Sequence, residues 1–351
     1  MRRPTAVTDA AAMTDTPIQL PVPVAVPAEV HDTASGLPGG RVRRRFPRIG
    51  RKALRAMAAL GVLGAVVNWG VLGPLTHDIN ADPAFRSAQM PQGGSVAVAT
   101  AAALLDREIN ANGWTPNDPF FAPSAVLDNM PNFQMGVVKA VGRFTFEMLD
   151  QVSRTRGSSR ADPDLERASG FLQFPPDIWV IDPSRSWMPT VPSEHQYRAG
   201  VAALNSYNAR LASGQAVFER RADTLAETLR QVSADLGSQT AQLDRAQNDG
   251  WWVFSRKADD LFYQNKGMLY AYSVTLKAFG EDFAPVIRGS NLEAVWAQAM
   301  ASLEQGSQLR PLVVLNGDLD RSIFANHLAI QGFYMKRAIL QLEEVVSVLA
   351  V

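Results

Sequence analysis

Glu147 is the acidic residue whose neighbours best suit catalysis. Three apolar residues lie close to it in the sequence, Phe144, Phe146 and Met148. An apolar setting raises the pKa of a carboxyl group, and an acid that stays protonated near neutral pH can donate a proton to a glycosidic oxygen. Glu147 is therefore the candidate catalytic residue, for a hydrolase or lyase acting on cell-wall glycans. The non-catalytic alternative is a half-buried glutamate bonded to Arg143 or another neighbour.

The rest of the sequence offers no familiar reactive centre. There is no cysteine, and none of the four histidines has a second histidine at a metal-ligand spacing. H-E-x-x-H, an EF-hand loop, G-x-S-x-G and a glycine-rich phosphate loop do not occur. We therefore expect no metal site and no cofactor.

Several segments combine aromatic, amide and proline residues, as in "GWTPNDPFF", "DNMPNF" and "NDGWW". Rigid aromatic loops suit recognition of a partner. The alternative is that Asn and Asp cap helices while the aromatic rings close the ends of a bundle. The candidate binding residues in these segments are Trp114, Asn117, Asp118, Phe120, Phe121, Asn129, Asn132, Trp251 and Trp252.

Two further polar groups are candidates for binding. Arg154 and Arg156 lie in "RTRGSSR", which is either an anion-binding turn or an ordinary solvated one. Asn326, His327, Gln331 and Tyr334 follow helical spacing near the C-terminus. They form either a buried hydrogen-bond network that sets helix register or part of a pocket.

The elements that must position these residues are helices. Ser95 is a plausible N-cap and Gly113 a stop for a helix over 95–113, and a proline-rich loop follows at 114–123. Further helices are predicted over 124–130, 132–152, 163–172, 257–279, 291–306 and 321–349. Ser193 and Gln196 fit a capping box that opens a long helical tract. The connector 173–192 has room for a strand of three or four residues, but prolines bracket it closely.

Two heptad stripes indicate long packed helices. One runs from Leu204 to Leu243, and Gly214 and Gly237 are the places where it could break. The other runs from Phe324 to Leu349. We therefore predict an all-α fold, a multi-helix bundle with long heptad-patterned helices, preceded by one transmembrane helix.

The N-terminal part predicts a membrane anchor. Residues 1–55 carry ten basic and four acidic residues, and the first 40 are rich in proline and glycine, so we expect a disordered basic leader. Residues 56–75 form an uncharged run of 20 residues, about the length that crosses a hydrocarbon core of ~30 Å. The positive flank predicts that the leader is cytoplasmic and that residues 79–351 form a periplasmic domain.

Cleavage and self-association of the anchor depend on finer features. A leader of about 55 residues before the apolar run, and Ile79 three residues before the nearest cut, favour an uncleaved anchor. Gly61 and Ala65 form a small-residue pair on which two spans could pack, and Asn68 could hydrogen-bond across such a contact. Phosphate headgroups are a better partner for the basic run than nucleic acid, which has no need of an adjacent apolar segment.

Five segments together resemble one bacterial family. They are "LLDREINANGWTPNDPFF", "LDNMPNFQMG", "RTRGSS", "ADDLFYQNKGMLYAY" and "NHLAIQGFYMKRA". Over about residues 75–351 the chain resembles the uncharacterised domain-of-unknown-function family numbered 2333. The resemblance implies a single-span envelope layout and no activity.

The combined interpretation is a non-catalytic protein of the bacterial inner membrane, with a scaffolding or partner-binding role in the envelope. Its expected partners are the membrane and an envelope protein or a second copy of the chain, and no nucleic acid. The alternative is the cell-wall glycan hydrolase or lyase with Glu147 as its acid.

Overall fold

The computed structural model describes residues 50–76, 78–90, 92–155, 161–182, 186–248, 256–311, 313–315 and 325–350. Within these ranges every regular element is a helix, which confirms the all-α class. The helices from Lys52 onward lie in one compact unit that extends to Val351. Residues 1–49, which hold most of the predicted leader, lie outside the described residues.

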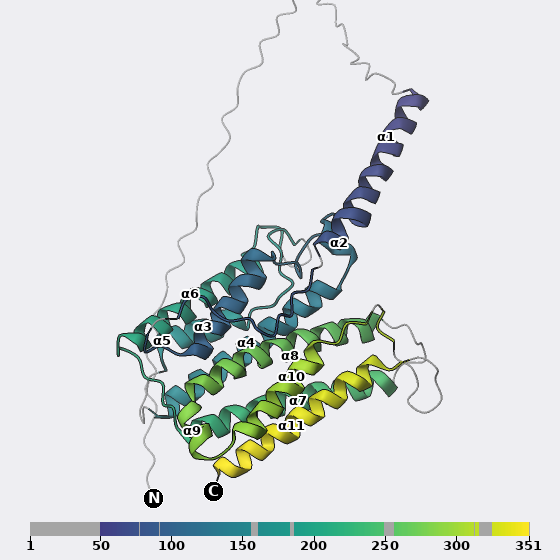
Figure 1. Ribbon diagram of the computed structural model, residues 1–351. Helices are drawn as coiled ribbons and strands as arrows, with labels where there is room; N and C mark the ends of the chain where they lie inside the picture. The colour runs from purple at the N-terminus through teal and green to yellow at the C-terminus, as the bar shows by residue number, and fades with distance from the viewer. Residues whose placement is uncertain are drawn as a thin grey trace, which may run out of the picture. The chain divides into compact units, whose positions relative to one another are not determined.

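The predicted span forms a helix that begins at Arg51 and ends at Leu75. It consists of α1 (Arg51–Ala65), the π-helical η1 (Val66–Leu72) and the short α2 (Gly73–Leu75) (Figure 1). Among the described helices it is the one long and apolar enough to cross a membrane, and its side chains are almost all exposed. A helix of 25 residues that leaves its apolar surface uncovered suggests membrane anchoring.

The remaining helices follow in two groups along the chain. The first contains α3 (Val96–Asp106), the π-helical η2 (Arg107–Ala111), the 3-10 turn η3 (Pro123–Val126), α4 (Asn129–Thr155), α5 (Pro163–Leu172) and α6 (Ser193–Ala212). The second contains α7 (Ala222–Asn248), α8 (Arg256–Asp282), α9 (Ala284–Gly289), α10 (Glu293–Ser307) and α11 (His327–Leu349).

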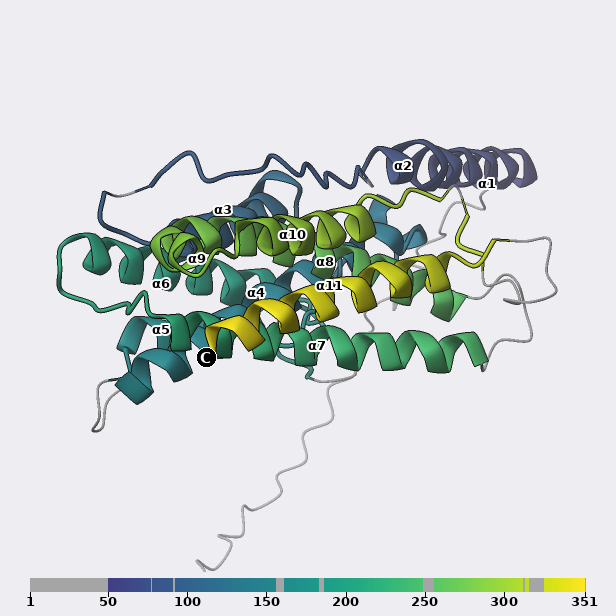
Figure 2. The same cartoon turned by 60° about the horizontal axis from the view of Figure 1, so that its bottom comes forward.

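Helix α8 joins the two groups. It packs along α4 and α3 on one side and against α10 on the other. Helix α11 lies beside α7 and α10, as both views show (Figures 1 and 2). Most residues of α8 from Asn265 onward are buried, because this helix has neighbours on all its faces.

The closest helix contact is between α4 and α8, and two glycines permit it. A Cβ atom on Gly267 would lie 2.0 Å from the carbonyl oxygen of Phe133. A Cβ atom on Gly136 would lie 2.0 Å from the carbonyl oxygen of Gln264. Each helix therefore presents a glycine to the backbone of the other, and no larger side chain fits.

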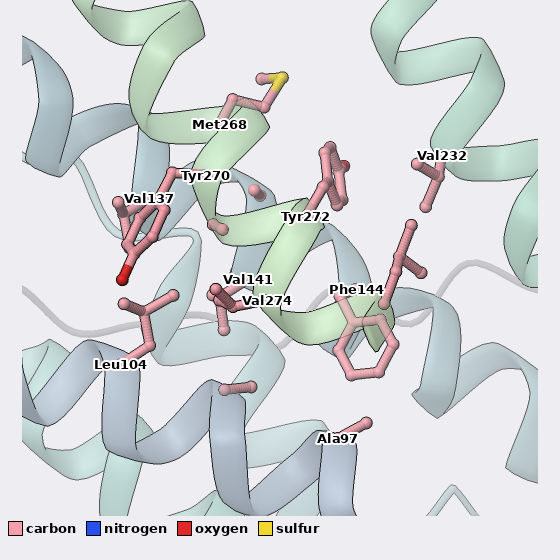
Figure 3. Close-up of a cluster of buried hydrophobic side chains, with 14 of the residues drawn as sticks. Ala97, Leu104, Val137, Val141, Phe144, Val232, Met268, Tyr270, Tyr272 and Val274 are labelled. Atoms are coloured by element: carbon pink, nitrogen blue, oxygen red, sulfur yellow. The ribbon is translucent and has the colours of Figure 1, made fainter. Parts of the chain in front are cut away.

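Large side chains fill the space on either side of this contact. Figure 3 shows Tyr270, Tyr272 and Val274 of α8 among residues of α3 and α4 such as Leu104 and Phe144. Both tyrosines are buried, and their hydroxyls find acceptors: Tyr270 donates to the carbonyl of Asp82 (2.9 Å) and Tyr272 to Asp235 Oδ2 (2.8 Å). The core therefore gains apolar area without leaving these hydroxyls unpaired.

A buried carboxylate links the start of α3 to the end of α8. Asp282 accepts hydrogen bonds from Ser95 Oγ (2.6 Å), the backbone N of Val96 (3.0 Å) and the backbone N of Ala97 (3.1 Å). Ser95 also caps α3 itself, as predicted, because its Oγ accepts from the backbone N of Val98 (3.2 Å). The free N–H groups of the first helical turn are thereby satisfied inside the protein.

The heptad stripe from Leu204 to Leu243 belongs to two helices. The chain leaves α6 at Ser213, passes Gly214 with φ of +73°, and begins α7 at Ala222. Gly214 is thus a break, whereas Gly237 lies inside α7. Helix α6 packs on α5 and α3, while α7 packs on α11, so the two halves of the stripe bury against different partners.

The capping box predicted at Ser193 is wrong. Helix α6 begins at Ser193, and the N-cap residue is Pro192. Ser193 Oγ instead donates to the carbonyl of Pro175 (2.7 Å) and accepts from the backbone N of Ile178 (3.0 Å). The hydroxyl therefore holds the connector 173–192 against the start of α6. In the described part of that connector there is no strand.

Candidate functional site

One face of α4 forms the floor of a groove between neighbouring helices. We define the α4 groove by two adjoining pockets that share Arg143 and Phe146. The α4 residues that line the two pockets extend from Met135 to Arg154, about 28 Å along the helix at 1.5 Å per residue. A groove of this length suits an elongated ligand.

The first pocket is mainly apolar, with a volume of about 470 Å³. Its lining comprises Met135, Val138, Lys139, Gly142, Arg143 and Phe146 of α4, Leu172 and Gln173 at the end of α5, Phe174 and Pro176 of the connector, Tyr197 of α6 and Gln264 of α8. Phe146 is 47% exposed, so an aromatic ring on the floor remains open to solvent. Such a lining favours an apolar side chain as ligand.

The second pocket is polar, with a volume of about 320 Å³, and it contains Glu147. Asp150 and Arg154 of α4 and Gln231 and Asp235 of α7 complete it together with the shared residues. Burial raises the pKa of Glu147, as the sequence suggested, and the hydrogen bond from Gln151 Nε2 (2.6 Å) opposes that rise. Arg143 pairs instead with Asp235, at 3.7 Å. The proposal that Glu147 is a catalytic acid remains a prediction.

Lys139 gives the apolar pocket a positive charge. Burial lowers the pKa of its amine, and the charge of Asp235 partly opposes that effect. Within the described ranges no carboxylate oxygen lies within 4.0 Å of Lys139 Nζ. A partly dehydrated cation beside an apolar pocket attracts an anionic group on a ligand.

Trp114 and Asn117, two of the predicted binding residues, are buried and attach their loop to the connector. Trp114 Nε1 donates to the carbonyl of Pro176 (3.0 Å), and its ring meets that of Tyr197 edge-on with centroids 4.9 Å apart. Asn117 Nδ2 donates to the carbonyl of Ile178 (2.8 Å) and to Glu194 Oε2 (2.6 Å). These contacts place Pro176 and Tyr197 in the wall of the α4 groove.

Asp118, Phe120 and Phe121 lie further along the same loop. Asp118 accepts a hydrogen bond from Ser124. Phe120 and Phe121 are 81% and 56% exposed, and the two rings meet edge-on. The predicted aromatic loop therefore has a buried first half and an exposed second half.

Asn129 and Asn132 lie at the start of α4, away from the groove. Asn129 is the first residue of the helix. Asn132 Nδ2 donates to the carbonyl of Asp128 (2.9 Å) and to Asp260 Oδ1 (2.8 Å).

Three aspartates lie together at this end of α4 and α8. Burial raises the pKa of Asp259 to about 6, and the charges of Asp128 and Asp260 add to the rise. Across the described ranges no group of three or more His, Cys, Asp or Glu is arranged to hold a metal ion.

Replacing Asp259 with asparagine is expected to stabilise the protein in a pH-dependent way. The folded pKa exceeds the unfolded value of ~3.9, so ionisation of Asp259 costs stability as the pH rises through about 6. We expect Asp259→Asn to gain about 1 kcal/mol at pH 7.5, discounted for partial exposure, and only a small fraction of that at pH 4. Thermal unfolding of the full-length chain in detergent, followed by circular dichroism, measures both values.

Asp223 provides the control for this prediction. It lies in the first turn of α7, as Asp259 does in α8, but its side chain is 66% exposed and pairs with Arg221. Because this pair is on the surface, Asp223→Asn should change the free energy of unfolding by no more than about 0.5 kcal/mol at pH 7.5. An equal gain for Asp259→Asn at pH 4 and pH 7.5 would contradict the assigned titration.

Arg154 lines the polar pocket and pairs with Asp150 at 2.7 Å, one helical turn away. Its side chain is 63% exposed, so the pair contributes little to stability. Three other candidate binding residues, Arg156, Trp251 and Trp252, lie outside the described residues.

Two of the four polar residues predicted near the C-terminus connect α11 to other segments. Asn326 caps α11 by accepting from the backbone N of Ala329 (2.7 Å). His327 Nδ1 accepts from the backbone N of Leu315 (2.9 Å), and Gln331 Nε2 donates to the carbonyl of Phe262 (3.0 Å). Tyr334 meets the ring of Phe333 edge-on. These bonds orient α11 against α8 and the segment before it.

Sequence reasoning missed Lys139, Arg143 and Tyr197. The signal lay in α4, where Met135, Lys139, Gly142 and Phe146 follow helical spacing on one face. The same spacing is typical of any amphipathic helix, so the sequence does not indicate that this face lines a pocket. Tyr197 lies 58 residues beyond Lys139 in the sequence, and only the fold brings it to the same pocket.

The comparisons with known proteins identify a family without assigning an activity. The family described as "Uncharacterized protein conserved in bacteria (DUF2333)" matches the chain over residues 75–250 and 245–350. No curated protein and no solved structure matches the chain.

Proposed function

The chain belongs to the uncharacterised bacterial family DUF2333, and we propose that it is a membrane-anchored, non-catalytic binding protein of the cell envelope. Its α4 groove receives an elongated segment of a partner protein. The observation that carries this proposal is the apolar pocket of about 470 Å³ with Lys139 in its lining.

The proposed topology has one span, with a cytoplasmic leader over residues 1–55, a membrane helix over 56–75 and a periplasmic domain over 79–351 in the inner membrane. Arg51, Lys52 and Arg55 lie at the N-terminal end of the apolar helix, and basic residues favour the cytoplasmic side. The helix bundle then lies outside the cytoplasm, where it can meet envelope proteins.

The shape and charge of the groove support a peptide segment as ligand. A floor of about 28 Å accommodates roughly five turns of a partner helix. The lining predicts an apolar side chain opposite Phe146 and an acidic side chain opposite Lys139. A carboxylate placed beside Lys139 would also raise the pKa of its amine and so oppose the effect of burial.

A photo-crosslinker at Phe146 tests the proposal. We expect the full-length protein carrying benzoylphenylalanine at position 146 to capture one reproducible envelope protein in living cells. Lys139→Glu in the same protein should reduce the adduct at least about tenfold, because it places two negative groups together in a partly dehydrated site. Lys139→Arg should retain the adduct, since the charge is preserved.

The matched control is a crosslinker at Leu340, which is 67% exposed on α11, away from the groove. The same partner captured equally from positions 146 and 340 would contradict a groove-specific interaction. An adduct that Lys139→Glu leaves unchanged, with melting temperature also unchanged, would overturn the role of Lys139.

A further inference from the structure

Two neighbouring loops expose large apolar side chains with few charges among them. The first is 119–127, "PFFAPSAVL", and it contains no charged residue. The second comprises 178–181, "IWVI", and 186–192, "SWMPTVP", which are also uncharged. The most exposed side chains of the two loops are Phe120 (81%), Phe121 (56%), Ile181 (55%), Trp187 (91%) and Met188 (74%). A cluster of this size on the surface marks an interaction site.

The first loop touches the predicted span directly. Asn68 Nδ2, in the π-helical part of the span, donates to the carbonyl of Phe121 (3.0 Å). A Cβ atom on Gly73 would lie 2.9 Å from the carbonyl oxygen of Pro123. The polar side chain near mid-span therefore has a hydrogen-bond partner within the same chain.

The second loop lies against the first. The rings of Phe121 and Trp179 meet edge-on, with centroids 6.0 Å apart. Two hydrogen bonds close the second loop: the backbone N of Thr190 donates to the carbonyl of Val180 (2.9 Å), and Thr190 Oγ1 donates to that of Trp179 (2.7 Å). The first loop thus contacts the C-terminal half of the span, and the second loop packs on the first.

The attachment at Asn68 sets the depth of these loops in a bilayer. Asn68 lies seven residues before Leu75, the end of the apolar helix, and seven residues of helix rise about 10 Å. A bilayer that covers the apolar run would therefore reach the level of Phe121. Phe121 would then lie within the outer leaflet, where apolar and aromatic side chains are stable, and tryptophan favours the nearby boundary between acyl chains and headgroups.

We propose that these two loops insert their apolar side chains into the outer leaflet of the same bilayer that the span crosses. The proposal rests on the membrane anchoring proposed above. The occupant of the exposed apolar surface is then lipid. The bundle is held at the membrane by these two loops as well as by the span.

Several backbone groups of the first loop have hydrogen-bond partners within the loop, which favours insertion. The backbone N of Ala122 donates to the carbonyl of Pro119 (2.8 Å), and that of Ala125 to the carbonyl of Ala122 (3.2 Å). Pro119 and Pro123 have no N–H to satisfy. An unpaired backbone group is strongly unfavourable in hydrocarbon, so these bonds lower the cost of insertion.

Single cysteines test the proposal, because the native chain contains none. The full-length protein is made with cysteine at Phe120, Trp187, Val62 or Leu340, spin-labelled and reconstituted into nanodiscs of phosphatidylethanolamine and phosphatidylglycerol. Val62 is 65% exposed in the middle of the span, and Leu340 is 67% exposed on α11. Collision with oxygen and with a water-soluble nickel chelate then reports the depth of each label.

We expect labels at positions 120 and 187 to show an oxygen-to-nickel accessibility ratio several-fold above that at position 340, approaching that at position 62. Ratios at 120 and 187 equal to that at 340, with a lipid-like value at 62, would overturn the insertion and leave the anchor intact. A water-like value at position 62 would overturn the anchor itself, so the two failures are distinct.

Discussion

Gly267→Ala is expected to destabilise the bundle by more than about 3 kcal/mol, because its new methyl group would overlap the α4 backbone. The added Cβ atom would lie 2.0 Å from the carbonyl oxygen of Phe133 and 2.8 Å from the carbonyl carbon. Backbone inside a packed helix cannot yield as a flexible side chain can, so α4 and α8 must separate. Thermal or urea unfolding of the full-length chain in mild detergent measures the loss.

Two further alanine variants test the cause. Gly136→Ala places its Cβ atom 2.0 Å from the carbonyl oxygen of Gln264, and it should be comparably damaging. Gly237→Ala, inside α7, meets nothing within 4 Å and should gain about 0.5–1 kcal/mol, since alanine favours a helix interior over glycine. If Gly267→Ala melts at the wild-type temperature, the close contact between α4 and α8 is wrong.

Asp282→Asn is expected to cost about 3 kcal/mol, although the two side chains have nearly the same shape. The carboxylate receives three hydrogen bonds at the start of α3, and Arg220 lies 3.6 Å away. An amide would bring an N–H group against donors at one of the two positions, and it would remove the negative charge that stabilises a helix N-terminus. Chemical denaturation measured as above gives the free energy of unfolding.

Glu281→Gln is the matched control, one residue earlier in α8. Glu281 is 39% exposed and forms a surface ion pair with Arg86 at 2.6 Å, so its neutralisation should change stability by no more than about 0.5 kcal/mol. Equal losses for the two variants would show that the buried hydrogen bonds of Asp282 contribute no more than a surface charge.

The sequence by itself determined the helical class, the apolar span and many helix boundaries. These properties depend on residues close together in the chain. The helix predicted over 163–172 is α5 to the residue, because Asp162 and Pro163 form a strong local start signal. Ser95 and Gly113 likewise mark the ends of one helical segment through their own local chemistry.

Heptad spacing was less informative where two helices followed one another. The stripe from Leu204 to Leu243 keeps nearly regular spacing across a nine-residue loop at 213–221. Spacing records which residues share a face, and it carries no information about which neighbour covers that face. Packing therefore decided that α6 buries against α3 and α5 while α7 buries against α11.

Only the tertiary structure decided the role of the polar and aromatic residues. Trp114 and Phe120, six residues apart in one motif, are 7% and 81% exposed. Lys139 lines the same pocket as Tyr197 of α6 and Gln264 of α8. Asn68 donates a hydrogen bond to the carbonyl of Phe121, which is 53 residues away in the sequence. Composition and periodicity are local properties, whereas a pocket or a cluster of exposed loops arises from contacts between distant segments.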